Sequence, residues 1–182
     1  GIAIGSFTAN QTAHQQRAGI TDHLGDHVED AGRFATAEIE SRNVAALRRF
    51  FLKHSGETLN WLDDMGLAFH GPSPEPPNRV PRMHNVLPNA TAYISTLHSR
   101  VLDLGGTIRC NAAVTNLLKT HGRISGIEAM IDGSTESIEA KRGVVLAAGD
   151  YANSPELIAR FKGPKFSTIE GINQHACGDG HL

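Results

Sequence analysis

A cluster of prolines constrains the fold of this chain more than any other feature. Five of the eight prolines lie between Pro72 and Pro81. Proline fixes φ and has no backbone N–H, so it is excluded from helix interiors and from central strands. The sequence therefore predicts an extended surface loop over residues 69–87.

Four basic side chains lie in the predicted loop, namely His70, Arg79, Arg82 and His84. Long irregular loops inside compact domains are usually functional or mobile. Two interpretations stay open at this point. The four side chains could meet an anionic or carbonyl substrate, or they could be solvated charges without a role.

The composition is that of an ordinary globular domain. The chain has 182 residues, of which 40% are hydrophobic and 20% charged, so a packed core is expected and disorder is not. The formal net charge is −2, which argues against a nucleic-acid binder held by phosphate contacts. No apolar run approaches the roughly 20 residues of a membrane-spanning helix. We expect an α/β protein of the cytoplasm.

Cysteine and histidine usage predicts no metal site. Cys110 and Cys177 are too few for a disulfide framework or a cysteine-rich zinc site. The ten histidines include no helical ligand pattern such as H-E-x-x-H, and scattered surface or core histidines are the simpler interpretation.

The first half of the chain is predicted to be mainly helical. Residues 10–25 are polar and loop-like, and helices are expected over residues 26–37, 43–65 and 89–104. In the second helix, one face is predicted from three-or-four spacing: Val44, Leu47, Phe51, Thr58, Leu62 and Met65. The single tryptophan, Trp61, is adjacent to that face and is interpreted as a core or interface filler.

The second half is predicted to be mainly strands. Short strands are expected over residues 107–110, 113–119, 124–131 and 135–140, and the last three are joined by short glycine-containing turns, which predicts an antiparallel meander. Residues 143–149 are continuously apolar and end in small residues. This pattern is typical of a strand buried on both faces, as in a parallel sheet. Ser154 and Pro155 then begin a helix that extends to about residue 161.

Two segments could bind a ligand. Small residues at the carboxyl end of the predicted buried strand would let a ligand approach the backbone. Glycines on both sides of Asp179 permit a tight turn whose N–H groups could face an acceptor. Each motif is weak alone, but their order around a meander is specific.

In this order the motifs resemble those of the flavoproteins that include fumarate reductase, succinate dehydrogenase and 3-ketosteroid dehydrogenase. The resemblance covers nearly the whole chain. Its matching stretches are residues 5–9 with 18–20, 57–62 with 65–69, 105–108, Val114, 122–127, 144–149 ("VVLATGG"), 153–157 ("NPE") and 178–180 ("TGDG").

The resemblance implies an α/β fold, namely part of a Rossmann-like FAD-binding domain, and a set of residues that contact FAD. The backbone of Val114 would meet the adenine ring. Three small residues would pack near the adenosine and the diphosphate: Ala147, Ala148 and Gly149. Asp179, with Gly180 beside it, would lie by the flavin side. The residues that would skirt the isoalloxazine are Ile4, Gly5 and Ser6.

Some features depart from the family. Asp150 stands where a second glycine is usual, and Cys177 stands where threonine is usual. A carboxylate near a diphosphate would be repulsive unless it points away. The chain has no Gly-x-Gly-x-x-Gly turn, which would place the FAD pyrophosphate on a helix N-terminus, and it does not reach the family's substrate-binding histidine and arginines.

We therefore expect residues 1–182 to be an internal fragment of one FAD-binding domain, with a helical part over 1–105 and the strands, meander and last helix over 106–182. The parent would transfer hydride between FAD and a carbon–carbon bond next to a carboxylate or carbonyl, in a dicarboxylate or ketosteroid-like substrate. The rest of the parent polypeptide would be its partner. The chain alone would be inactive and would bind FAD weakly or not at all. Its catalytic residues are unknown at this point, and a non-catalytic binding or interaction module on the same fold is the alternative.

Overall fold

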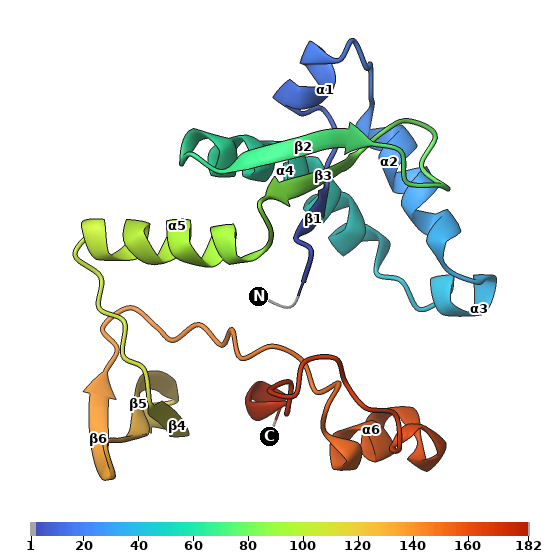
Figure 1. Ribbon diagram of the computed structural model, residues 1–182. Coiled ribbons are helices and arrows are strands. Elements are labelled where there is room, and N and C mark those ends of the chain that lie inside the picture. Colours follow the sequence, from blue (N-terminus) through green and yellow to red (C-terminus); the bar gives the residue numbers. More distant parts are fainter. Residues whose placement is uncertain (1–2, 182) are drawn as a thin grey trace. The chain divides into compact units, whose positions relative to one another are not determined.

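The computed structural model describes residues 3–181. The chain divides into two compact units, of which unit 1 ends at Thr107 and unit 2 begins at Ile108 (Figure 1). Each unit has its own three-stranded antiparallel sheet and is described separately below.

The sheet of unit 1 is built from β1 (Ser6–Thr8), β2 (Ala68–Ser73) and β3 (Met83–Leu87), in the order β1-β3-β2. The prediction of one irregular loop over residues 69–87 is therefore wrong at both of its ends. Pro72 is tolerated because β2 is an edge strand with a register shift between His70 and Ser73. The remaining prolines of the cluster lie between the two strands, where no ladder hydrogen bond is needed.

Unit 1 contains five α-helices among its described residues: α1 (Ala13–Arg17), α2 (Leu24–Ala31), α3 (Ala37–Glu40), α4 (Ala45–Asp64) and α5 (Thr91–Asp103). Helix α1 lies in the stretch that was predicted to be a loop. It begins with a capping box, because the Thr12 hydroxyl accepts from the Gln15 N–H and the Gln15 side chain accepts from the Thr12 N–H. Within residues 3–181, no helix is both long and apolar enough to cross a lipid bilayer.

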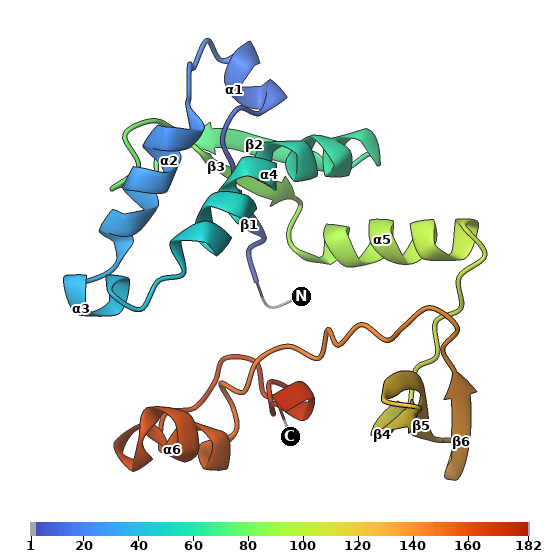
Figure 2. The ribbon, with the colours of Figure 1, turned by 180° about the vertical axis from the view of Figure 1, so that it is seen from behind.

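Helix α4 packs on the sheet of unit 1, as Figure 2 shows from behind. The core joins Leu59 and Leu62 of this helix to Phe69 and Val86 of the strands. The predicted helix is confirmed, but most of its predicted face is wrong, since Val44, Leu47, Phe51 and Thr58 are exposed. The buried face is instead formed by Leu52, Ser55, Gly56, Leu59 and Leu62. Helix α4 carries apolar residues on two neighbouring faces, and their spacing in the sequence does not show which of the two faces is buried.

The sheet of unit 2 is the predicted meander. Strands β4 (Ala112–Thr120), β5 (Arg123–Ile131) and β6 (Ser134–Glu139) pair in chain order. Gly122 and Gly133 have φ of 80° and 82°, the left-handed values that these tight turns require. Helix α6 (Pro155–Lys162) also follows the prediction, and the Ser154 hydroxyl caps it by accepting from the Leu157 N–H.

Two predicted strands are not formed. Residues 107–110 and 143–149 have irregular backbone, and Val145 is 89% exposed. A strand needs a neighbour that takes up its backbone hydrogen bonds, and neither sheet of the described residues pairs with these segments. The prediction that residues 144–149 are buried on both faces is therefore wrong for this chain. The apolar run is an extended, exposed segment that follows the meander (Figure 1).

Candidate functional site

A cleft in unit 2 is lined by five of the nine residues predicted to contact FAD. Its volume is about 480 Å³. Strand β4 contributes Val114, the apolar segment contributes Ala147 and Ala148, and the last turn contributes Asp179 and Gly180. These positions are far apart in the sequence, and the fold brings them together.

The lining of the cleft suits a flat ring that is joined to a group carrying hydroxyls. Val114, Leu117 and Ile127 supply apolar surface from the meander. Asp179 is the only charged residue among those that line the cleft, and its carboxylate can accept hydrogen bonds from hydroxyls. A β-carbon added at Gly180 would lie 3.4 Å from that of Ala148, an ordinary van der Waals contact, so the two segments meet closely in the cleft.

The glycine turn is held by contacts behind the cleft. Gly178 has φ of 82°, and a β-carbon there would overlap the side chain of Leu157, so any larger residue is excluded. Its N–H donates to the carbonyl of Asp150 at 3.1 Å. The Asp150 carboxylate accepts from the Ala152 N–H at 2.7 Å and does not line the cleft. The Asp150 carboxylate, at the position where glycine is usual, thus accepts a hydrogen bond within its own loop.

Two other residues near these segments lie outside the cleft. Gly149 was predicted to contact FAD and does not line the cleft, although its φ of 81° is a left-handed value that favours glycine. The Cys177 thiol donates to the carbonyl of Gln174 at 3.5 Å, so the sulfur replaces the hydroxyl of the usual threonine as a weak donor.

Ile4, Gly5 and Ser6, the other three predicted FAD contacts, belong to unit 1. Ile4 is exposed and lines a separate cavity of about 500 Å³ with His70 and Asn85. The carbonyl of Gly5 accepts from the Tyr93 hydroxyl at 3.0 Å, and the Ser6 hydroxyl donates to the Asn85 side chain at 2.6 Å.

The proline segment does not present Arg82 to solvent. Its guanidinium is fully buried and pairs with Asp22 at 2.6 Å and with Asp30 at 2.7 Å. Burial raises the pKa of the Asp30 carboxyl, but hydrogen bonds from Arg79 and Arg82 outweigh burial and lower that pKa to about 2. Neither interpretation from the sequence is right for Arg82, because it is neither a substrate contact nor a solvated charge.

His84 is also buried and structural. Its Nδ1 lies 3.3 Å from the carbonyl of Phe7, which can only accept, so Nε2 accepts from the Thr12 hydroxyl at 3.0 Å. Burial lowers the pKa of His84, which keeps the ring neutral. Arg79 is partly exposed but bonds to Asp26, Glu29 and Asp30. Of the four basic side chains, His70 is the one that lines a cavity, the one shared with Ile4.

The buried cluster also includes a histidine that the sequence did not single out. His27 accepts from the Asn10 amide at 2.9 Å through Nδ1. Burial, together with the nearby charge of Arg82, lowers its pKa to about 4. A polar residue on the inner face of a predicted helix would have been the only sequence signal of this network. Among residues 3–181, no group of three or more His, Cys, Asp or Glu is placed to hold a metal ion.

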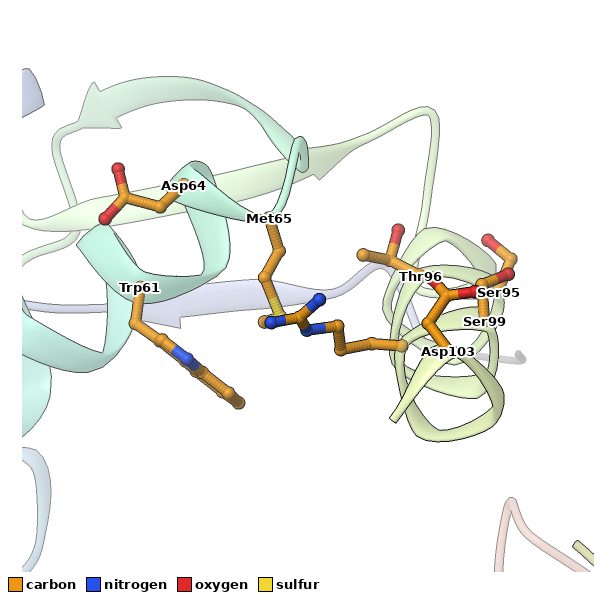
Figure 3. Close-up of a pocket in the computed structure, with 8 residues that line it drawn as sticks. Trp61, Asp64, Met65, Ser95, Thr96, Ser99 and Asp103 are labelled. Atoms are coloured by element: carbon orange, nitrogen blue, oxygen red, sulfur yellow. The ribbon is translucent and has the colours of Figure 1, made fainter. Parts of the chain in front are cut away.

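Figure 3 shows a groove between the end of α4 and helix α5, in unit 1. Its volume is about 700 Å³, and it carries charges of both signs from Asp64, Arg100 and Asp103. Trp61 is 54% exposed and lines this groove, so the core half of its interpretation is wrong, and its role as an interface filler stays a prediction. None of the predicted FAD contacts lies in the groove.

The chain matches the protein family described as the FAD binding domain over residues 2–181. It belongs to that family. The resemblance inferred from the motifs is therefore confirmed at the level of the family and of the fold.

Several relatives of this FAD-binding domain are oxidoreductases. A probable fumarate reductase of Shewanella frigidimarina is 25% identical over all of this chain, which spans 31% of that protein. The NADH:acrylate oxidoreductase of Vibrio harveyi is 28% identical over 59% of this chain and 11% of its own length. The digoxin reductase of Eggerthella lenta is 31% identical over 57% of this chain and 20% of its own length.

Solved structures show the same fold. The open conformation of a flavocytochrome c3 fumarate reductase matches 98% of this FAD-binding domain and 31% of that chain, with a TM-score of 0.83 and 26% identity. A 3-ketosteroid-Δ4-(5α)-dehydrogenase from Rhodococcus jostii matches 98% of this chain and 44% of its own, with a TM-score of 0.80 and 20% identity. The chain thus spans less than half the length of each of these relatives.

Proposed function

We propose that the cleft of unit 2 binds the adenosine part of FAD and that the chain is the middle part of a flavin-dependent oxidoreductase. The observation that carries this proposal is the meeting of Val114, Ala148 and Asp179 in one cleft. These three residues come from the motifs that resemble flavoprotein motifs, and the chain belongs to the FAD-binding family.

The residues of the cleft fit the parts of an adenosine. Val114 would contact the adenine ring through its backbone, and the small side chains of Ala147 and Ala148 leave room for the ring and the ribose. Asp179 would lie at the end of this cleft that leads toward the flavin, and its carboxylate can accept from hydroxyl groups of the cofactor. Gly149 would follow toward the diphosphate, where its lack of a side chain would allow close approach.

The residues of unit 1 would serve the flavin end of the cofactor. Ile4 and Gly5 would skirt the isoalloxazine, and Ser6 offers a hydroxyl whose position is fixed by Asn85. The Gly5 carbonyl is fixed by the Tyr93 hydroxyl, so this segment keeps its conformation before a cofactor binds.

The reaction of the whole protein would be reduction or formation of a carbon–carbon double bond next to a carboxylate or carbonyl. Bound FAD supplies a hydride donor or acceptor for such chemistry. In the direction of reduction, one carbon takes the hydride and its neighbour takes a proton. Fumarate and acrylate, named for two of the relatives, are both unsaturated carboxylates. The cytoplasmic location expected from the sequence stays a prediction.

Ligand-observed NMR on the 182-residue chain tests the proposed cofactor site. We expect FAD and ADP to bind weakly, with a Kd of about 1 mM, because the chain has no glycine-rich turn to hold the pyrophosphate. FMN, which has no adenosine, should bind at least tenfold more weakly. Ala148→Trp should abolish binding of FAD and ADP by filling the cleft.

Ala113→Trp is the matched control, because Ala113 is exposed on β4 and does not line the cleft. This variant should bind ADP like the parent chain. If Ala148→Trp binds FAD and ADP as well as the control does, the cleft is not the adenosine site, and a non-catalytic module becomes the better description of the chain.

A further inference from the structure

The side chain of Asn153, in the NPE-like motif, bridges two segments that are distant in the sequence. Its Nδ2 donates to the carbonyl of Gln174 at 2.9 Å, and its Oδ1 accepts from the Gly171 N–H at 3.3 Å. Its backbone N–H donates to the carbonyl of Ala176 at 2.9 Å. One residue therefore makes three hydrogen bonds to residues 171–176.

These bonds fix the segment that leads into the cleft. Ala176 is buried, and two residues later the Gly178 N–H donates to the carbonyl of Asp150. The chain then forms the turn of Asp179 and Gly180, which lines the cleft together with β4. Residues 150–153 directly follow the other lining segment, so the contacts of Asn153 join the ends of two walls of one cleft.

The chemistry of the amide explains why asparagine is suited to this position. It offers a donor and an acceptor on one short side chain, as the Gln174 carbonyl and the Gly171 N–H require. An aspartate would keep the acceptor but would turn a carboxylate oxygen toward the Gln174 carbonyl. A leucine has nearly the same shape and can make neither bond.

We propose that Asn153 is a positioning residue that sets the place of Asp179 and Gly180 against Ala148 and thereby the affinity of the cleft for an adenine nucleotide. The affinity part rests on the proposed function. The positional part does not, because it concerns hydrogen bonds within the chain.

The experiment compares Asn153→Leu with Gln174→Leu in the 182-residue chain. Gln174 is exposed and lies in the same segment, and only its backbone carbonyl takes part in the bridge. Amide hydrogen exchange is measured without ligand, and ADP binding is then titrated by NMR. Asn153→Leu should speed exchange at Gly178 about tenfold, since hydrogen bonds of ordinary strength are lost. It should weaken ADP binding about tenfold, while Gln174→Leu should change neither quantity.

Exchange at Ala129 of β5 separates positioning from general destabilisation, because this buried residue belongs to the meander. Unchanged exchange at Ala129 supports the proposal, and equal acceleration at Ala129 and Gly178 overturns it. Unchanged exchange at Gly178 in Asn153→Leu also overturns it, whether or not ADP binds. If the parent chain binds no ADP, amide hydrogen exchange alone decides the positional part of the proposal. Should the leucine variant not fold, Asn153→Asp should show the same direction of change at Gly178.

Discussion

Replacing Arg82 with leucine should strongly destabilise unit 1. The guanidinium of Arg82 is fully buried and donates to both Asp22 and Asp30, as well as to the Asn78 side chain at 2.9 Å. Leucine would leave both buried carboxylates with fewer partners. Asp30 would keep the hydrogen bonds from Arg79. Asp22 would keep those from the Gln15 side chain and from the His23 N–H.

The expected loss of stability follows from this geometry. Removing one partner of a buried ion pair destabilises a protein by about 3–5 kcal/mol, because a buried charge is left uncompensated. A domain of this size is stable by about 5–15 kcal/mol. Arg79→Leu is the matched control. Arg79 is 34% exposed and bonds to some of the same acids, so water can replace much of what it provides, and we expect a clearly smaller loss of stability than for Arg82→Leu.

Urea unfolding followed by tryptophan fluorescence measures this difference. Trp61 is the only tryptophan of the chain and lies on α4, so its emission reports on unit 1 alone. The midpoint for Arg82→Leu should fall far below that of Arg79→Leu. Equal midpoints for the two variants would refute the structural role of Arg82 and would reopen its interpretation as a ligand contact.

Three further predictions concern unit 1. The pKa of His27 is about 4 in the folded chain and 6.5 in the unfolded chain, so the unfolded chain binds more protons at any pH between these values. The free energy of unfolding should therefore fall by up to about 3 kcal/mol as the pH drops from 6.5 to 4. Acid titrations of urea midpoints would show this slope, and His27→Gln should flatten it. Gly56→Ala should destabilise unit 1 by about 1–3 kcal/mol, because the added β-carbon would overlap the Asn10 carbonyl, and a neutral result in thermal melts would contradict the packing. Gly25→Ala, with open space around it on α2, should instead raise stability by about 0.5–1 kcal/mol.

The sequence predicted local structure well wherever one short signal sufficed. The meander followed from short strands joined by glycine-containing turns, and the start of α6 followed from Ser154 and Pro155. These elements depend on hydrogen bonds between residues that are close in the chain, so their pattern is visible in a short window. Capping of α1 by Thr12 was visible in the same way but was missed, because the surrounding stretch is polar.

Signals that depend on distant partners were misinterpreted. Proline spacing predicted a loop, yet β3 is the central strand of a sheet because β1 and β2 pair with it from both sides. The apolar residues 144–149 predicted a strand, and without a pairing neighbour among the described residues they form none. In both cases the deciding partner lies outside the window in which the pattern is read.

The sequence by itself predicted the family and five of the residues that line the cleft, because motifs of glycine and small residues show where a ligand could approach the backbone closely. Only the tertiary structure decided what the basic residues do. In the sequence, Arg82 and His84 look like basic residues that could contact a ligand at the surface. In the structure both are buried, Arg82 against Asp22 and Asp30 and His84 against Thr12, because the proline segment packs on α1 and α2. Burial depends on which distant parts of the chain pack together. That packing decides whether a charged side chain is paired inside the protein or is free to contact a ligand.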